Sequence, residues 1–132
     1  MNRYQILIEY EGTLYNGWQI QKKGKSIQEN IEIVLSKLLK EKIKIYGSGR
    51  TDTGVHAKEQ SAHFDTTNKI IQKDKLLNSL NFFLNKKKIS ILKIKKKNKL
   101  FHSRYSAIER QYTYLIRNDA SPSVINFNRE WH

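Results

Sequence analysis

The residues best suited to chemistry in this chain surround one acid in a loop of small residues. The loop reads Gly49-Arg50-Thr51-Asp52-Thr53-Gly54-Val55-His56-Ala57. Small residues on both sides of Asp52 let a bulky ligand approach the backbone closely. Arg50 lies two residues before Asp52, and a nearby cation favours the ionised carboxylate. An ionised, accessible carboxylate can act as a covalent nucleophile, so we predict that Asp52 and Arg50 are catalytic.

Other chemistry is compatible with parts of this loop. Asp52 begins the aspartic-protease tripeptide Asp-Thr-Gly, but that chemistry needs two carboxylates sharing a proton, and the chain has no second copy. Arg50 would also oppose proton sharing. His56, His63 and Asp65 carry metal-ligand atoms, but they are scattered, and histidines on strands are more often structural. The acid also fits an ordinary loop residue, because short motifs recur by chance.

A second cluster mixes aromatic residues and arginines with little acid. It runs through Phe101-His102-Ser103-Arg104-Tyr105-Ser106-Ala107 and Arg110-Gln111-Tyr112-Thr113-Tyr114. Aromatic faces stack on unpaired bases and arginine pairs with phosphate, so the mixture suits RNA. We predict that Arg104, Arg110 and Lys58 contact RNA. The alternative is that Tyr112 and Tyr114 are strand residues facing a core.

Hydrophobic periodicity predicts the elements that must position these residues. The predicted strands cover residues 3–11, 43–47, 55–66, 89–95 and 112–116, and the predicted helices cover residues 26–39 and 74–84. Ser26 followed by Glu29 forms a capping box at the start of the first helix. The apolar residues change parity at Leu92, which indicates a bulge or burial of both faces.

This order of elements predicts an α+β fold of the ferredoxin-like or RNA-recognition-like type. Strand, helix, strand, strand, helix and strand form a split βαβ pattern, followed by one added strand. We expect an antiparallel sheet with both helices on one face.

Composition limits the possible classes of protein. The 132 residues favour one compact domain. The 25 lysines and arginines against 12 acids give a net charge of +13, which attracts polyanions, although abundant Lys, Asn and Ile also fit a mutational bias. The absence of cysteine excludes disulfides and a cysteine nucleophile. The apolar stretch near the N-terminus is too short for a signal peptide or membrane span, and we expect a cytoplasmic protein.

Taken together, these segments resemble the TruA-type tRNA pseudouridine synthases. The resemblance rests on an ordered set of motifs that covers essentially the whole chain. They are Glu9-Tyr10-Glu11-Gly12, Gly17-Trp18-Gln19, Ser26-Ile27-Gln28, the loop 49–57, Gln60, His63-Phe64, and the clusters 101–107 and 110–114.

The resemblance implies roles for individual residues. Asp52 matches the catalytic aspartate, Arg50 the arginine that interacts with it and helps hold the extruded nucleotide, and Tyr112 the tyrosine that packs against the target base. Arg104 and Arg110 match basic positions near the site. The implied activity is conversion of uridine to pseudouridine in the anticodon arm of tRNA, without a metal or organic cofactor.

The resemblance also implies a second half that this chain does not contain. Members of the family have two related halves with the active cleft between them, and family relatives are dimers. We therefore expect residues 1–118 to form the N-terminal catalytic half-domain and residues 119–132 to begin the connection to the other half. A fragment of this kind is either an enzyme half or a catalytically silent, basic RNA-binding module.

Overall fold

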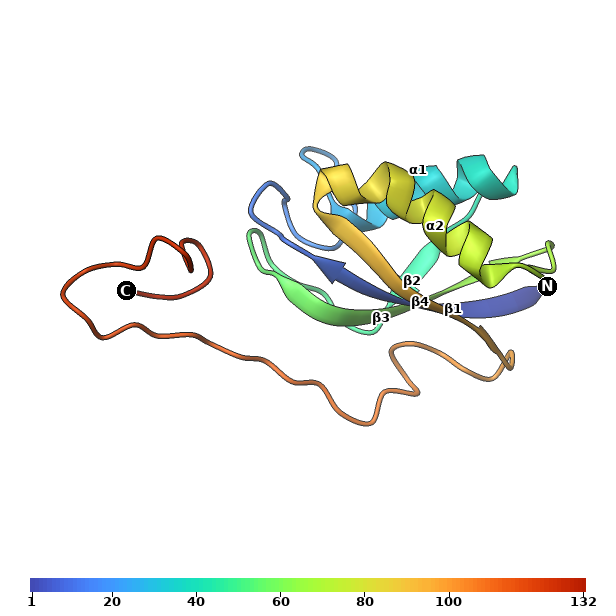
Figure 1. Cartoon of the computed structure of the whole chain (residues 1–132). Helices are drawn as coiled ribbons and strands as arrows, with labels where there is room; N and C mark the ends of the chain where they lie inside the picture. The colour runs from blue at the N-terminus through green and yellow to red at the C-terminus, as the bar shows by residue number, and fades with distance from the viewer.

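A computed structural model describes residues 1–132 and has the expected order of elements up to the end of the fourth strand. The elements are β1 (Asn2–Tyr10), α1 (Ile27–Leu39), β2 (Ile45–Gly47), β3 (Ala57–Thr66), α2 (Lys73–Leu84), a short 3-10 turn (Asn85–Lys87) and β4 (Ile89–Lys97). The four strands form one antiparallel sheet in the order β2-β3-β1-β4, with both helices on one face (Figure 1). This order is that of the ferredoxin-like split βαβ fold, so the predicted fold class is confirmed.

Local sequence accounts for the start and end of α1. The side chain of Ser26 accepts a hydrogen bond from the backbone N–H of Glu29 at 3.1 Å, as the capping box requires. Lys40 then turns the chain with a φ of 53°, the left-handed conformation common at the ends of helices. The residues that α1 buries follow helical spacing and are Ile27, Ile31, Val34 and Leu35.

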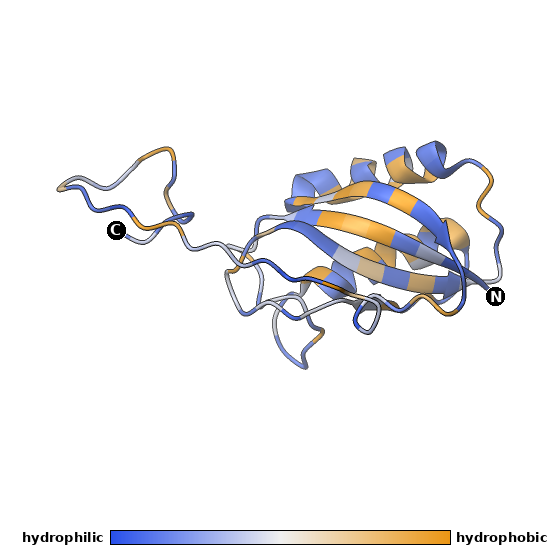
Figure 2. Cartoon of the chain, turned by 90° about the horizontal axis from the view of Figure 1, so that it is seen from below, coloured by the Kyte–Doolittle hydropathy of each residue, from blue (hydrophilic) through white to orange (hydrophobic).

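The core lies between the helices and one face of the sheet. Alternate residues of β1 point toward the helices and are buried, namely Tyr4, Ile6, Ile8 and Tyr10. Figure 2 shows the other face, where hydrophobic and hydrophilic residues alternate along the strands. Residues 98–106, which we call the strap, follow β4 and pass below the sheet on the side opposite the helices (Figure 1).

The predicted irregularity of β4 is a β-bulge. Leu7 of β1 pairs with Lys93, whereas the next residue, Ile8, pairs with Ile91, so Leu92 is the extra residue. The parity change in the sequence is therefore confirmed as a bulge, and β4 is two residues longer than predicted at its C-terminal end.

The strand predicted at residues 112–116 is absent. Only an isolated bridge joins Ile116 to Trp131, and the side chains of Tyr112 and Tyr114 are 65% and 86% exposed. A strand requires a hydrogen-bonding neighbour as well as suitable side chains, and residues 112–116 pair with neither edge strand of the sheet, β2 or β4. The prediction of an added strand was wrong for this reason, and so was the alternative that these tyrosines face a core.

Neither α1 nor α2 has the length and apolar character that crossing a bilayer requires.

Candidate active site

Asp52 lies near the tip of the loop that joins β2 to β3. Its side chain is exposed and has no hydrogen bond or ion pair within the chain. The Val55 backbone N–H donates to the Asp52 carbonyl at 3.2 Å and closes a tight turn. Gly54 occupies this turn with a φ of +81°, a conformation that glycine adopts without strain. The carboxylate is thus free to meet a ligand from solution.

A second loop, between β1 and α1, packs closely against the loop of Asp52. A Cβ atom on Gly17 would lie 2.5 Å from the Thr51 carbonyl oxygen, so only glycine fits there. The Trp18 backbone N–H donates to the same carbonyl at 3.1 Å, and the Gly54 N–H donates to the Tyr15 carbonyl at 3.3 Å. The backbone on both sides of Asp52 is therefore held by the segment that contains the Gly17-Trp18-Gln19 motif.

Side chains of β1 and β3 also hold the loop in place. The Tyr10 hydroxyl lies 2.7 Å from the Thr51 hydroxyl, and the buried ring of Tyr10 stacks on Trp18 with centroids 6.1 Å apart. Burial raises the pKa of Tyr10, so its hydroxyl stays protonated and can donate. The Gln60 side-chain amide donates to the Gly49 carbonyl at 2.6 Å, and its oxygen accepts from the Ser48 hydroxyl at 2.8 Å.

The sequence motifs that contain Tyr10, Thr51 and Gln60 did not predict that these side chains support the loop. Polar residues at strand positions that face the core would have been a usable signal, because a buried polar side chain needs a partner.

The other predicted catalytic residue, Arg50, is exposed, and no ion pair joins it to Asp52. Lys58, predicted to contact RNA, is exposed near the start of β3, six residues beyond Asp52 in the chain. Both cations are on the surface around the loop.

Two predicted RNA-binding or substrate-binding residues reach the start of the loop. The Arg110 guanidinium donates to the Ser48 carbonyl at 2.8 and 3.2 Å. The Tyr112 hydroxyl lies 4.0 Å from the position that a Cβ on Gly49 would occupy. The chain beyond the strap thus returns to the residues that lead into Arg50. Arg104 is exposed, and its guanidinium lies over the Tyr105 ring at 5.9 Å.

The residues of the metal-site alternative have separate partners. The His56 Nδ1 atom accepts from the Gly12 backbone N–H at 2.8 Å, which puts the proton on Nε2, 2.9 Å from the Asn128 carbonyl oxygen. His63 contacts Ser103, and Asp65 pairs with an arginine. No group of three potential ligand side chains lies close enough to hold a metal ion.

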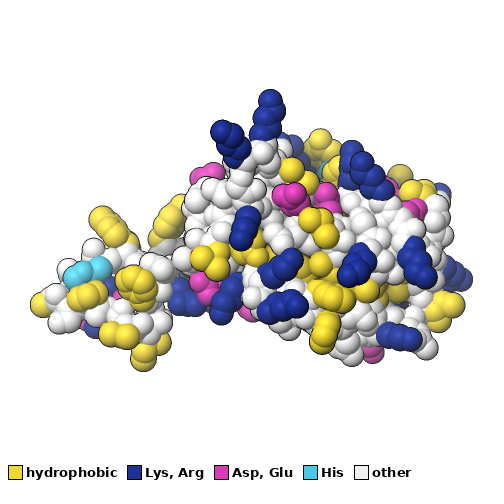
Figure 3. All heavy atoms as spheres, turned by 90° about the horizontal axis from the view of Figure 1, so that it is seen from above, with side chains coloured by type: hydrophobic (Ala, Val, Ile, Leu, Met, Phe, Trp, Pro, Cys, Tyr) yellow, Lys and Arg dark blue, Asp and Glu magenta, His cyan; other side chains and the backbone are white.

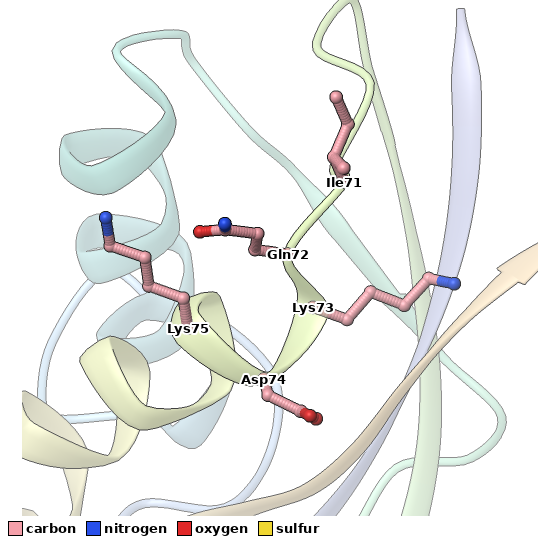
Figure 4. A pocket seen from close by; sticks show the side chains of 5 residues that line it. All are labelled: Ile71, Gln72, Lys73, Asp74 and Lys75. Atoms are coloured by element: carbon pink, nitrogen blue, oxygen red, sulfur yellow. The ribbon is translucent and has the colours of Figure 1, made fainter.

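Positive charge is widely distributed. Figure 3 shows the helix face, where lysines and arginines are spread over the surface and not gathered at one hollow. A pocket at the start of α2 is lined by residues 71–75, whose side chains point in different directions (Figure 4). It lies at the far end of β3 from Asp52 and has no converging polar groups, so we assign it no function.

The fold and this site define the class of protein. An antiparallel sheet of the RNA-recognition type carries an unpaired carboxylate on a loop with basic and aromatic side chains around it. The family model described as tRNA pseudouridine synthase matches residues 6–106. The chain belongs to this family.

The chain is also similar to proteins named tRNA pseudouridine synthase A in other organisms. The chain is 58% identical over 132 residues to tRNA pseudouridine synthase A of Pelagibacter ubique (strain HTCC1062), and the match covers 100% of the chain and 54% of that protein. It is 45% identical over 130 residues to tRNA pseudouridine synthase A of Neorickettsia sennetsu, covering 98% and 54%. The protein of that name from Anaplasma phagocytophilum is 43% identical over 133 residues, covering 98% and 53%. The chain thus spans about half the length of the curated relatives it matches.

Proposed function

We propose that this chain is the nucleophile-bearing half of a tRNA pseudouridine synthase, with Asp52 as the nucleophile. The observation that carries the proposal is the free, exposed Asp52 carboxylate on a loop held from both sides, in a chain of this family. The tRNA substrate is the one that the names of the relatives state. The anticodon arm is the proposed site of modification, and the cytoplasm is the proposed compartment.

The reaction exchanges one bond of uridine for another. The target nucleotide is extruded from its stack, and Asp52 attacks either the ring or the sugar carbon. The bond between the sugar and N1 breaks, the base rotates, and the sugar joins C5. The bond between Asp52 and the nucleotide then breaks, which restores the free carboxylate. The hydrogen on C5 leaves as a proton and N1 gains one, so atoms balance without a cofactor. Arg50 helps hold the extruded nucleotide, and Tyr112 packs against the base and limits its escape.

Basic residues around the loop bind the RNA backbone in this proposal. Arg104, Arg110 and Lys58 pair with phosphates. Residues 1–118 act as the catalytic half-domain, and residues 119–132 begin the connection to a second half that supplies the opposite wall of the cleft. The exposed apolar side chains of the C-terminal segment support this, since Val124, Ile125 and Trp131 are 91%, 88% and 73% exposed. A homodimer is part of the same proposal.

A second candidate function is RNA binding without turnover. It is favoured by the exposure of the Asp52 side chain in this chain, because water reaches the carboxylate. The two candidates differ in whether product forms when the other half is supplied.

The test joins residues 1–132 to the C-terminal half of the Pelagibacter ubique relative and measures pseudouridine formed in tRNA. We expect product from the joined protein and none from its Asp52→Ala variant, while both bind tRNA equally. Glu59→Ala is the matched control, since Glu59 is also an exposed acid near the loop and should keep full activity. Turnover by the Asp52→Ala variant would overturn the nucleophile assignment. A joined protein that binds tRNA without making product would favour the second candidate.

A further inference from the structure

The first residues of the strap are hydrogen-bonded to the face of the sheet opposite the helices. Arg3 on β1 pairs with Asp65 on β3 through two hydrogen bonds of 2.8 and 2.9 Å. The same guanidinium donates to the Lys99 carbonyl at 3.0 Å and to the Phe101 carbonyl. A cation fixed by a bidentate carboxylate is a rigid donor, so the first residues of the strap have a defined place.

The centre of the strap is held by His63. The His63 Nδ1 atom is 3.1 Å from the Ser103 backbone N–H and 3.0 Å from the Ser103 hydroxyl. A backbone N–H can only donate, so Nδ1 carries no proton and His63 is neutral with its proton on Nε2. His63 and Ser103 are buried, at 1% and 2% exposure, and the His63 ring stacks on Tyr46 at 5.3 Å.

Burial keeps His63 in this neutral form. The pKa of His63 is lowered to about 4, mainly by burial and also by the charges of Arg3 and His102, whereas Asp65 acts in the opposite direction. At neutral pH the acceptor at Nδ1 is therefore always available to Ser103.

The strap folds tightly on itself just after this anchor. The His102 Nδ1 atom accepts from the backbone N–H groups of Arg104 and Tyr105 at 3.1 and 3.3 Å. The Ser106 N–H donates to the His102 carbonyl at 2.7 Å. Arg104 is therefore part of a hydrogen-bonded turn, and the residue before it, Ser103, is held in place by His63.

One further side chain, that of Arg110, connects the strap to the loop of Asp52. The Arg110 Nη2 atom donates both to the Arg104 carbonyl at 3.2 Å and to the Ser48 carbonyl at 2.8 Å. Ser48 directly precedes Gly49, which begins the loop. The strap and the loop therefore share one guanidinium.

We propose that His63 is a positioning residue that anchors the strap through Ser103, and so sets where Arg104 and Arg110 meet RNA beside the Asp52 loop. The role of the two arginines rests on the proposed function, but the anchor itself does not. His63 is buried, so it acts through Ser103 and not by touching the substrate.

The first test measures the anchor without RNA. His63→Phe keeps an aromatic ring against Tyr46 and removes the acceptor. Amide hydrogen exchange by NMR at Ser103 should become about tenfold faster, because Ser103 loses both of its hydrogen bonds to His63. Exchange at Ser106, whose turn follows this anchor, should also become faster. The matched control is Ser61→Ala, which removes a 2.8 Å hydrogen bond from Gln5 on the same face of the sheet without touching the strap. Exchange that stays unchanged in His63→Phe would overturn the anchor.

The second test measures its consequence for RNA. Binding of a fluorescein-labelled anticodon stem-loop RNA is followed by anisotropy for the 132-residue chain. Arg104→Ala should weaken binding by roughly fivefold to tenfold at about 0.1 M salt, the effect of one lost phosphate contact. His63→Phe should weaken it at least as much, and should add little to Arg104→Ala.

If His63 only stabilised the fold, its effect on RNA binding would be independent of Arg104. The losses of affinity in His63→Phe and Arg104→Ala would then multiply in the double variant, and that result would overturn the positioning role. Ser103→Ala gives a second route if His63→Phe does not fold, since it removes only the hydroxyl and should speed exchange and weaken binding by smaller factors. If the unaltered chain bound no RNA, the proposed function would fail, while the exchange measurement would still decide the anchor.

Discussion

Tyr10 and Thr51 are joined by a 2.7 Å hydrogen bond between their hydroxyl groups, although 41 residues separate them. This bond links the buried end of β1 to the residue directly before Asp52. A buried hydroxyl partner of this kind fixes a loop more firmly than a contact exposed to water, because solvent does not compete for it.

Tyr10→Phe should therefore reduce catalysis more than it reduces binding. In the protein joined to a C-terminal half, we expect kcat to fall and KM to change little, because the carboxylate is less well placed while the RNA contacts remain. The free energy of unfolding should fall by about 1 kcal/mol. Steady-state kinetics and urea unfolding measure the two quantities.

The matched control is Tyr15→Phe. The Tyr15 hydroxyl donates to the Lys87 carbonyl, away from the loop, so this variant should lose similar stability and keep its kcat. Equal losses of kcat in both variants would mean that the Tyr10 hydroxyl has no special effect on the loop.

Gly17→Ala should destabilise the chain more than Gly54→Ala. Both glycines have a positive φ, +92° and +81°, which costs about 1 kcal/mol or more for alanine. Only at Gly17 would the new methyl group meet backbone, 2.5 Å from the Thr51 oxygen, whereas nothing lies within 4 Å at Gly54. We expect losses of about 3 kcal/mol and about 1 kcal/mol in urea unfolding. A larger loss at Gly54 would contradict the packing of the two loops.

Stability should fall as the pH is lowered from 6.5 toward 4. The folded-state pKa of His63 is about 4, below the unfolded value of 6.5, so the unfolded chain binds more protons in this window. The contribution is fully present above pH 6.5 and amounts to about 3 kcal/mol at most. Arg3 and His102 act in the same direction on this pKa and Asp65 opposes them. Burial raises the pKa of Glu32, which makes a change of opposite sign.

Comparison with His63→Phe isolates the histidine. Thermal unfolding of both chains between pH 4 and pH 7 should show a steeper loss for the unaltered chain, and the two slopes should differ only within this range. Parallel curves would show that His63 is not held neutral by its surroundings.

RNA affinity should depend on salt through a small number of cations. Arg110→Ala and Lys58→Ala should each lower the slope of log K against log salt by about 0.7 to 0.9, the value for one phosphate contact. Lys75→Ala is the control, because Lys75 lies at the start of α2, which follows the end of β3 opposite to the Asp52 loop. The slope is measured by titration with tRNA at several salt concentrations. A slope that falls equally in all three variants would indicate diffuse attraction by net charge alone.

Local sequence predicted the parts of the fold that depend on neighbours in the chain. The start of α1 follows from Ser26 and Glu29, three residues apart, and the bulge at Leu92 follows from a change of parity within one strand. The exposed position of Asp52 follows from its small neighbours. These features need no knowledge of distant residues.

Contacts between distant residues escaped prediction. His63 and Ser103 are 40 residues apart, and nothing in either local segment indicates the other as its partner. The error at residues 112–116 has the same origin. Alternating tyrosines describe side chains suited to a strand, but an edge to pair with is a property of the whole sheet.

The bulge at Leu92 decides which way the side chains at the end of β4 face. Because of that one extra residue, Ile94 pairs with Ile6 and faces the helices, while Lys93, Lys95 and Lys97 face the other way. The Lys97 ammonium accordingly lies 5.1 Å from the centre of the Phe101 ring in the strap. In a regular β4 the parity of Ile89 and Ile91 would carry all three lysines into the interior. The one extra residue thus directs three lysine side chains away from the hydrophobic core.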